Sequence, residues 1–218
     1  MNVAIIGCAS VEYWARWGDQ FCASVEGMRT KPAKVIVASL EPLSVPSFVT
    51  NILSTELFWD SWNDAIRYST AEWVWPTGID DLFEVDALDG LNEAADVIAV
   101  SGMESTGQTF FPDAGGFERI LTSSDNPMRG SIMLRRSVAV ELPWRRTKWA
   151  DWCQWCEIRA GGYLVDFDTK VRFNHTRHAE ALSLHPDPVA QQHVELLKRL
   201  LLDGRVVRGP EWPPVLLG

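Results

Sequence analysis

Two adjacent carboxylates, Asp80 and Asp81, are the side chains of this sequence best suited to hold a cation. They follow the apolar run 73–75, which has strong strand preference, after a turn signalled by Pro76 and Gly78. A strand end that delivers two carboxylates suits a divalent cation such as Mg²⁺, which binds to one or two carboxylates and to substrate phosphates. The alternative is that the two acids cap a following helix, since acids favour the positive end of the helix dipole.

The stretch 63–88 around these acids is predicted to form a helix, a strand, a turn and a second helix. It resembles the centre of a family-2-type glycosyltransferase, a family with the GT-A nucleotide-sugar fold. The matching residues are Asn63, Ile66, Glu72, Trp73, Asp80 and Asp81. Two positions depart from the family pattern: Gly78 replaces the first acid of its Asp-x-Asp-Asp motif, and Trp62 replaces an Arg.

The resemblance extends over residues 2–183 and implies a fold. We expect an α/β three-layer sandwich with a mostly parallel central sheet and a ligand at the carboxyl ends of the strands. Residues 1–185 would form the catalytic domain, and 186–218 a C-terminal helix and Pro-rich tail that pack on the same domain. The implied activity is metal-dependent transfer of a sugar from a nucleoside-diphosphate donor to an acceptor hydroxyl, with inversion.

Three further residues receive roles from the resemblance. The stretch 149–163 matches a family segment in which an acid accepts the proton of the acceptor hydroxyl; Asp151 matches that acid, whereas Ala150 replaces the Glu before it. An acid in the first turn of a helix is the structural alternative. In the segment 171–183, His175 is the better match to a family His that reaches the metal or the diphosphate, and His178 is the rival. Asp80 with these histidines would hold Mn²⁺ or Mg²⁺.

The resemblance also places the donor. The loop 7–11 would contact the nucleotide base, and Ser39 stands where the family has an Asp that contacts the base or ribose. Small residues near 130 would let the donor sugar approach the backbone closely. The predicted donor contacts are Gly7, Ala9, Ser39, Glu41, Asn63, Gly78, Asp81, Gly130 and Ser131.

Composition limits the partners. Twenty Lys and Arg against 29 Asp and Glu give a formal net charge of −9, which disfavours nucleic-acid binding because phosphates require a basic surface. A hydroxylated DNA base stays among the acceptors, beside glycans, proteins and lipid carriers, because one basic cluster exists. It consists of Arg135, Arg136, Arg145, Arg146 and Lys148.

The cysteines and the hydrophobic pattern indicate the compartment. Four cysteines, with Cys153 and Cys156 in a helix-like run, fit buried thiols in a reducing environment better than a redox motif or a zinc site. The first residues resemble a strand rather than a signal peptide, and no segment has the length of a membrane span. We therefore expect a cytoplasmic protein, and the apolar tail leaves a homodimer possible.

Two other classes of function stay open. A non-catalytic binding or scaffold protein on the same fold would explain the residues at 39, 78 and 150 that depart from the family pattern. A nucleotidyltransferase also uses carboxylate-bound metal, although the sequence after the first strand lacks the Gly-rich basic loop expected there.

The pattern also predicts individual elements. Strands are expected at 2–6, 35–39, 56–59, 73–75 and 96–101, and helices at 14–28, 48–53, 63–69, 85–94, 149–160 and 188–202.

Overall fold

The computed structural model describes residues 1–56, 59–178 and 187–205. Its strands are β1 (Val3–Cys8), β2 (Lys34–Ser39), β3 (Val49–Leu53), β4 (Trp73–Pro76), β5 (Leu82–Phe83), β6 (Val97–Glu104), β7 (Thr109–Phe110), β8 (Ser131–Arg135) and β9 (Val165–His175). Its helices are α1 (Val11–Gly27), α2 (Trp59–Tyr68), α3 (Ala114–Arg119), α4 (Arg136–Glu141), α5 (Ala150–Gly161) and α6 (Pro188–Leu202).

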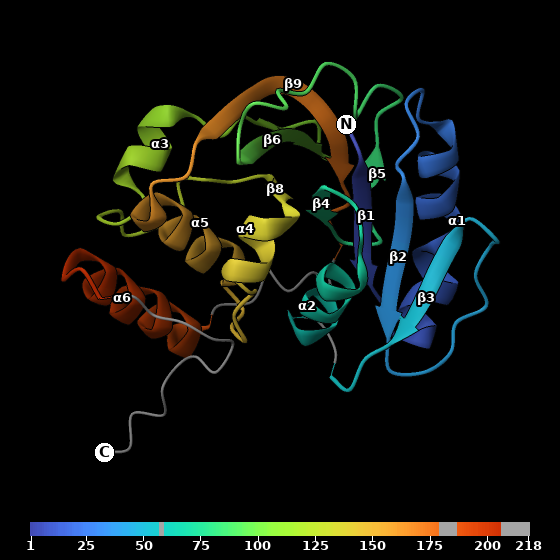
Figure 1. The fold of residues 1–218 in the computed structure, drawn as a ribbon, viewed down its shortest axis with the longest axis horizontal. Helices are drawn as coiled ribbons and strands as arrows, with labels where there is room; N and C mark the ends of the chain where they lie inside the picture. The colour runs from blue at the N-terminus through green and yellow to red at the C-terminus, as the bar shows by residue number, and fades with distance from the viewer. Residues whose placement is uncertain (57–58, 179–186, 206–218) are drawn as a thin grey trace.

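The strands of these described ranges form one curved sheet in the order β3-β2-β1-β4-β8-β6-β9-β5, with β7 paired to β6 (Figure 1). Strands β3, β2, β1 and β4 are parallel. Strand β8 is antiparallel to both β4 and β6, and β9 is parallel to β6. Because most strands share one direction, the predicted mostly parallel sheet is confirmed. Their carboxyl ends meet at one edge, where ligands of open α/β sheets bind.

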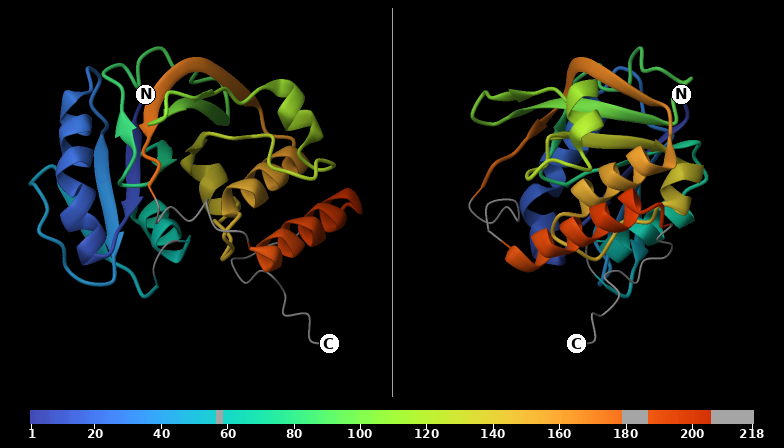
Figure 2. Two further views of the ribbon diagram at one scale, coloured as in Figure 1. Left: turned by 180° about the vertical axis from the view of Figure 1, so that it is seen from behind. Right: turned by 90° about the vertical axis from the view of Figure 1, so that its left-hand side faces the viewer.

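Helices cover both faces of the sheet, as alternation along β1 requires. Ile5 belongs to a buried cluster with Phe21 and Val25 of α1 on one face. Ile6 belongs to a second cluster with Ile66 of α2 on the other face, which α4, α5 and α6 also cover. Figures 1 and 2 show α1 at one end of the molecule and α5 and α6 at the other. The result is the predicted three-layer arrangement.

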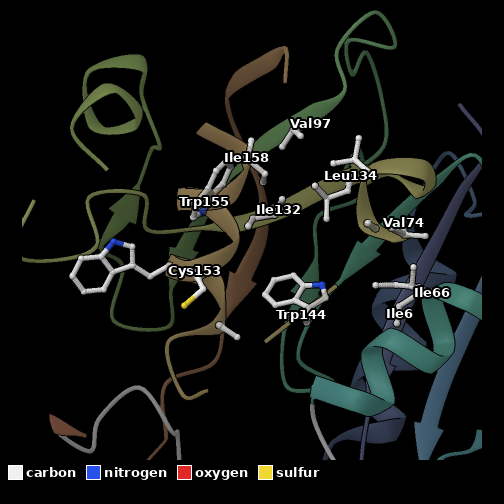
Figure 3. Close-up of a cluster of buried hydrophobic side chains, with 14 of the residues drawn as sticks. Ile6, Ile66, Val74, Val97, Ile132, Leu134, Trp144, Cys153, Trp155 and Ile158 are labelled. Atoms are coloured by element: carbon white, nitrogen blue, oxygen red, sulfur yellow. The ribbon is translucent and has the colours of Figure 1, made fainter. Parts of the chain in front are cut away.

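The second cluster carries much of the aromatic content (Figure 3). Trp155 and Ile158 of α5 pack with Ile132 of β8, and both α5 residues are fully buried. Trp144, from the connection between α4 and α5, is also buried in this cluster. Burial of such large side chains contributes roughly 1.5–3 kcal/mol each, so this cluster is what holds α5 on the sheet.

The helix predicted at 85–94 is wrong. Residues 85–90 form successive turns. Ala87 N donates to Glu84 O and Asp89 N donates to Asp86 O, each at a distance of 3.0 Å. The guanidinium of Arg172, on β9, donates to the carbonyls of Asp86 (2.9 Å) and Asp89 (2.6 Å). Those carbonyls therefore bind a distant buried cation and do not continue a helical ladder.

The elements predicted at 48–53 and 56–59 are also wrong. Val49–Leu53 is a strand, β3, which pairs with β2 through β-branched residues that favour strands over helices. Trp59 begins helix α2 rather than ending a strand, and residues 57–58 lie outside the described ranges. The other predicted elements are present, with boundaries that differ by a few residues.

The C-terminal helix packs on the rest of the chain. Asp187 caps α6, its side chain accepting from Val189 N and Ala190 N. Val194 and Leu197 are buried in the same cluster as α5. Residues 206–218 of the predicted tail lie outside the described ranges, and the domain division at 185 stays a prediction. Across the residues with assigned structure, no helix is long and apolar enough to cross a membrane.

Candidate functional site

The turn after β4 presents the two predicted acids at the carboxyl edge of the sheet. Asp81 Oδ2 accepts hydrogen bonds from Thr77 Oγ1 (2.9 Å) and from the backbone N–H of Gly78 (3.2 Å). These bonds close the turn. They leave Asp81 Oδ1 to face His175, whose Nδ1 lies 2.8 Å away. Asp81 thus orders the turn with one oxygen and reaches β9 with the other.

The short strand β5 explains why the acids meet this histidine. It pairs antiparallel with β9, so that Leu82 lies opposite Asn174 and Phe83 opposite Phe173. That register places Asp81 directly beside His175, 94 residues away in the sequence. Sequence periodicity did not reveal β5, because two residues are too short to show a pattern.

The second acid has a parallel arrangement. Asp80 Oδ2 lies 3.0 Å from His178 Nε2, and the same nitrogen lies 3.1 Å from the hydroxyl of Tyr13 on α1. The ring of Trp17, one helical turn further along α1, lies 5.4 Å from the His178 ring. The structure therefore brings all four predicted residues, Asp80, Asp81 and the two histidines, to one place. Their roles stay a prediction.

Gly78 is part of this geometry. A Cβ built on it would overlap Asp80 Oδ1 and would lie 3.4 Å from Asp81 Oδ2. The Asp80 carboxylate therefore occupies the space into which a side chain at 78 would project. With Asp80 in this position, an acid at 78 would not fit.

Burial and charge shape the ionisation of these groups. Burial, with the neighbouring charge of Asp81, raises the pKa of Asp80 above its usual value. The hydrogen bond to Asp81 raises the pKa of His175, and burial only partly offsets this. Burial also raises the pKa of Tyr13, which keeps its hydroxyl protonated and able to donate.

The donor atoms fit a divalent cation by their chemistry, since carboxylate oxygens and imidazole nitrogens are ligands for Mn²⁺. Two adjacent buried carboxylates also repel each other, a cost that a cation would relieve. In the described ranges no group of three His, Cys, Asp or Glu side chains is arranged to hold a metal ion. Each acid is paired with an imidazole instead, so Asp80 and His178 would have to separate to bind a metal, beside His175 held on Asp81.

Asp151 lies in the first turn of α5, where no side chain caps the helix. Its Oδ2 accepts a hydrogen bond from Asn126 Nδ2 (2.9 Å), and Asn126 Oδ1 in turn accepts from Met128 N (3.0 Å). Burial raises the pKa of Asp151, against the lowering effect of nearby backbone N–H groups. A carboxylate with a raised pKa is a stronger base, which is what proton abstraction requires.

A pocket of about 340 Å³ opens beside Asn126. One wall is the end of β6 with the β6–β7 hairpin, and the other is the loop before β8. Its lining residues are Glu104, Gln108, Thr109, Phe110, Phe111, Asp125, Asn126, Pro127 and Arg129. Glu104 also pairs with His175 in the β6–β9 register. The pocket is therefore linked to His175 through Glu104 and to Asp151 through Asn126.

Two of the predicted donor contacts from the first strands are structural neighbours of the site. A Cβ on Gly7 would lie 2.7 Å from Ile79 Cγ2, so the glycine makes room for the acid-bearing turn. Ala9 is buried, and its N–H donates to Ala38 O (3.0 Å). Neither observation tests a contact with a nucleotide.

Ser39 and Glu41 belong to a loop that Asn51 organises. Asn51, on β3, donates to Ser39 Oγ (2.8 Å) and to Val37 O (2.9 Å), and accepts from Leu43 N (2.9 Å). The Ser39 hydroxyl donates to Glu41 O (2.7 Å), while the Glu41 side chain is exposed. The buried Ser39 is thus committed to the loop, and Glu41 stays open for a ligand.

Asn63, Gly130 and Ser131 have partners within the protein. The Asn63 amide donates to Trp144 O (2.9 Å) and accepts from Trp144 N (2.8 Å), which joins α2 to the α4–α5 connection. Gly130 has φ of 132° and no room for a Cβ, because Val100 O would be 2.7 Å away. The hydroxyl of Ser131 accepts from Trp75 Nε1 (2.8 Å). These contacts are structural, and donor binding by the three residues stays untested.

Four residues of the site were absent from the sequence-based prediction. Thr77 closes the acidic turn, Tyr13 contacts His178, Asn126 contacts Asp151, and Glu104 lines the pocket. Only Thr77 carried a local signal, since a hydroxyl three or four residues before an acid often bonds it in a turn. The others act across more than 20 residues of sequence.

Comparison with known proteins identifies the fold. No family model and no curated protein sequence matches this chain. The structure of S. aureus TarS 1-349 in complex with UDP-GlcNAc has a TM-score of 0.69 at 14% identity, covering 95% of this chain and 68% of that one. A longer S. aureus TarS structure gives 0.58 at 10% identity, covering 92% of this chain and 44% of that one.

A second protein gives the same result. Mannosyltransferase PcManGT from Pyrobaculum calidifontis, in complex with GDP-Man and Mn²⁺, has a TM-score of 0.55 at 12% identity and covers 92% of this chain and 69% of that one. Together these likenesses show that the chain has the GT-A-type glycosyltransferase fold, as the resemblance of its motifs implied.

Proposed function

We propose that this protein is a glycosyltransferase that moves a sugar from a nucleoside-diphosphate donor to an acceptor hydroxyl. One observation carries the proposal: two acids after β4 converge with two histidines, one at the end of β9 and one just after it, at the carboxyl edge of a GT-A-type sheet. Structural neighbours hold UDP-GlcNAc in one case and GDP-Man with Mn²⁺ in another. Because fold does not fix function, the acids and histidines of the site support the activity more directly than the structural likeness does.

Asp80, with His175 and His178, would hold Mn²⁺ or Mg²⁺, which when bound neutralises the charge of the departing diphosphate. Asp81 has a different task, because Thr77 and Gly78 N already occupy one of its oxygens. It fixes the turn and orients the His175 ring through Nδ1, which leaves the other ring nitrogen available.

Asp151 is the proposed general base. Asn126 donates to one carboxylate oxygen and so limits rotation of the carboxylate that would receive the proton. In the transfer, the acceptor oxygen bonds to the anomeric carbon, the bond from that carbon to the diphosphate breaks, and Asp151 receives the acceptor proton. Direct displacement of this kind inverts the anomeric centre.

One observation favours a second candidate, a non-catalytic protein that binds nucleotide sugars. In the described ranges the acids are tied to imidazoles rather than grouped for a metal. A protein that only binds a donor has no need of charge neutralisation on a leaving group. Measured turnover separates this candidate from the enzyme.

Calorimetric titration of UDP and GDP, with and without Mn²⁺, tests the donor site, and mass spectrometry with a panel of nucleotide sugars tests turnover. We expect Mn²⁺-dependent nucleotide binding that Asp80→Asn abolishes while the melting temperature is kept. Asp19→Asn, at an exposed acid on α1, is the matched control. Wild-type affinity in the Asp80 variant would remove this residue from the donor site, and binding without turnover of any donor would favour the binding protein.

A further inference from the structure

The pocket between the β6–β7 hairpin and the loop before β8 is lined by none of the residues predicted to contact the donor. At one end Glu104 is the β6 partner of His175, and at the other end Asn126 is bonded to Asp151. A molecule in this pocket would therefore contact Asn126, which holds the proposed base, and Glu104, whose backbone pairs with His175 at the end of β9. Resting on the function proposed above, that is the place of the acceptor.

The charges of the pocket limit what it accepts. Glu104 and Asp125 contribute two carboxylates, whereas Arg129 is the cation among the lining residues. Arg177 neutralises part of the Glu104 charge from outside, with Nη1 3.1 Å from Oε2. With Arg177 counted, two carboxylates stand against two guanidinium groups, so the pocket offers a phosphate or sulfate group no net positive charge, in a protein whose net charge is −9. Because the carboxylates of the pocket would repel a second anion, acceptors that carry phosphate or sulfate groups are disfavoured.

The same carboxylates suit hydroxyl groups. In the described ranges, both partners of Glu104, Thr106 and Arg177, bond to Oε2, which leaves Oε1 for a ligand. Asp125 accepts from Ser123 Oγ (2.8 Å) through Oδ1, and within the same ranges its other oxygen accepts no hydrogen bond. An ionised carboxylate only accepts hydrogen bonds, so it favours a ligand rich in O–H donors.

Aromatic rings supply the apolar part of the pocket. Phe110 packs against Phe173 with ring centroids 5.7 Å apart, which anchors the hairpin to β9. The neighbouring Phe111 is 48% exposed, a large ring without cover at the pocket wall. The C–H face of a sugar ring can stack on such a ring while its hydroxyls reach the carboxylates. A volume of about 340 Å³ is near the lower limit for small-ligand pockets, enough for a single ring.

We propose that this pocket binds a neutral sugar unit of the acceptor, stacked on Phe111 and hydrogen-bonded through its hydroxyls to Glu104 and Asp125. The acceptor substrate is then a neutral glycan rather than a nucleic acid or another anionic polymer. Phe111 and Glu104 determine acceptor specificity and take no part in donor binding.

Saturation-transfer NMR without donor tests the pocket directly. The probes are neutral oligosaccharides of glucose, mannose or N-acetylglucosamine, with a sulfated oligosaccharide and a single-stranded DNA oligonucleotide as anionic comparators. We expect at least one neutral probe to bind the wild type. Phe111→Ala and Glu104→Gln should each weaken that binding about tenfold, which corresponds to ~1.4 kcal/mol.

Matched controls exist at the opposite edge of the sheet. Tyr68→Ala removes an exposed aromatic ring, and Glu93→Gln removes a carboxylate paired with the N-terminal amine. Both should leave sugar binding unchanged. The proposal is overturned if no neutral probe binds, if the anionic comparators bind better, or if the two pocket variants bind like the controls.

Separate titration of UDP and GDP with Mn²⁺ keeps the two proposals distinguishable. Phe111→Ala should bind nucleotide like the wild type. Nucleotide binding without any binding of neutral sugar would reject the acceptor pocket and keep the donor site. Sugar binding that depends on Phe111, without nucleotide binding, would reject the transferase and keep a carbohydrate-binding pocket.

Discussion

Substitution of Gly78 is the sharpest test of the acid–histidine arrangement. The glycine is not among those with positive φ, so its backbone conformation is open to any residue and a substitution acts through its side chain alone. In Gly78→Ala the new Cβ would overlap Asp80 Oδ1. The Asp80 carboxylate has to rotate, and it then leaves His178, whose Nε2 now lies 3.0 Å from Oδ2.

The magnitude follows from that geometry. Rotation of a short side chain away from its preferred conformation costs about 0.5–1.5 kcal/mol, so the protein should still fold. A hydrogen bond to a charged group contributes about 1.5–3 kcal/mol, and each 1.4 kcal/mol is a factor of ten. If Asp80 holds the metal on the diphosphate, its displaced carboxylate loses a charged contact of about this size with the cation, so Gly78→Ala should weaken Mn²⁺-dependent nucleotide binding by roughly ten- to a hundredfold.

Calorimetric titration of UDP and GDP with Mn²⁺ measures this effect, with thermal melting as the check on folding. Gly27→Ala is the control, since a Cβ there meets nothing within 4 Å. Gly78→Asp, which restores the family's first acid, should be impaired as well, because its Cβ meets the same oxygen. Unchanged affinity in Gly78→Ala, or tighter Mn²⁺ binding in Gly78→Asp, would refute the argument that Asp80 already fills that position.

Three further outcomes are expected. Asp151→Asn should keep nucleotide affinity but lose transfer by ~10²–10⁴-fold, as measured by product formation at saturating donor; transfer at the wild-type rate would exclude it as the base. Asn63→Ala should lower the free energy of unfolding by about 2–4 kcal/mol in denaturant titration, because it leaves the buried backbone of Trp144 without partners, whereas Asn92→Ala at an exposed turn should change it little. Gel shifts with duplex DNA at physiological salt should show no tight binding, given the net charge of −9; a complex with a steep salt dependence would contradict this.

The local sequence pattern was sufficient to predict the strands that are short runs of buried apolar residues, and one capped helix. The strands β1, β2, β4 and β6 are short apolar segments bounded by polar or turn residues, and α6 has a helical period after a capping acid. These signals depend on neighbours within a few positions, and tertiary contacts reinforce them. The two acids at the end of β4 were predictable for the same reason.

Long-range contacts account for the errors. The segment 85–94 has helical spacing, but Arg172 of β9 takes the carbonyls of Asp86 and Asp89. Strand β3 gains its pairing from the exposed edge of β2, which no local pattern reveals. The polar partners Tyr13 and Asn126 were missed because each acts on a residue of a distant element.

Asn63 matched the family motif, and in the structure it has a long-range structural contact. Its amide binds both backbone groups of Trp144, 81 residues further along the chain. A residue can be fixed in a motif because it joins two elements of the site rather than because it contacts the donor. The bonds to Trp144 show the structural reason, and donor binding by Asn63 stays a prediction.

The β6–β9 pairing unites the two halves of the site physically. Strand β9 ends with His175, and its neighbour in register is Glu104 at the end of β6. The bond from Ser105 N to His175 O (2.9 Å) and that from Arg177 N to Ser105 Oγ (3.1 Å) fasten the two strand ends beyond that pair. A shift of the β9 backbone at His175 would also shift Glu104, because the two strand ends are hydrogen-bonded to each other. The donor side and the proposed acceptor pocket are then coupled through one pair of strands, and a variant that perturbs Glu104 alone should leave this backbone coupling intact.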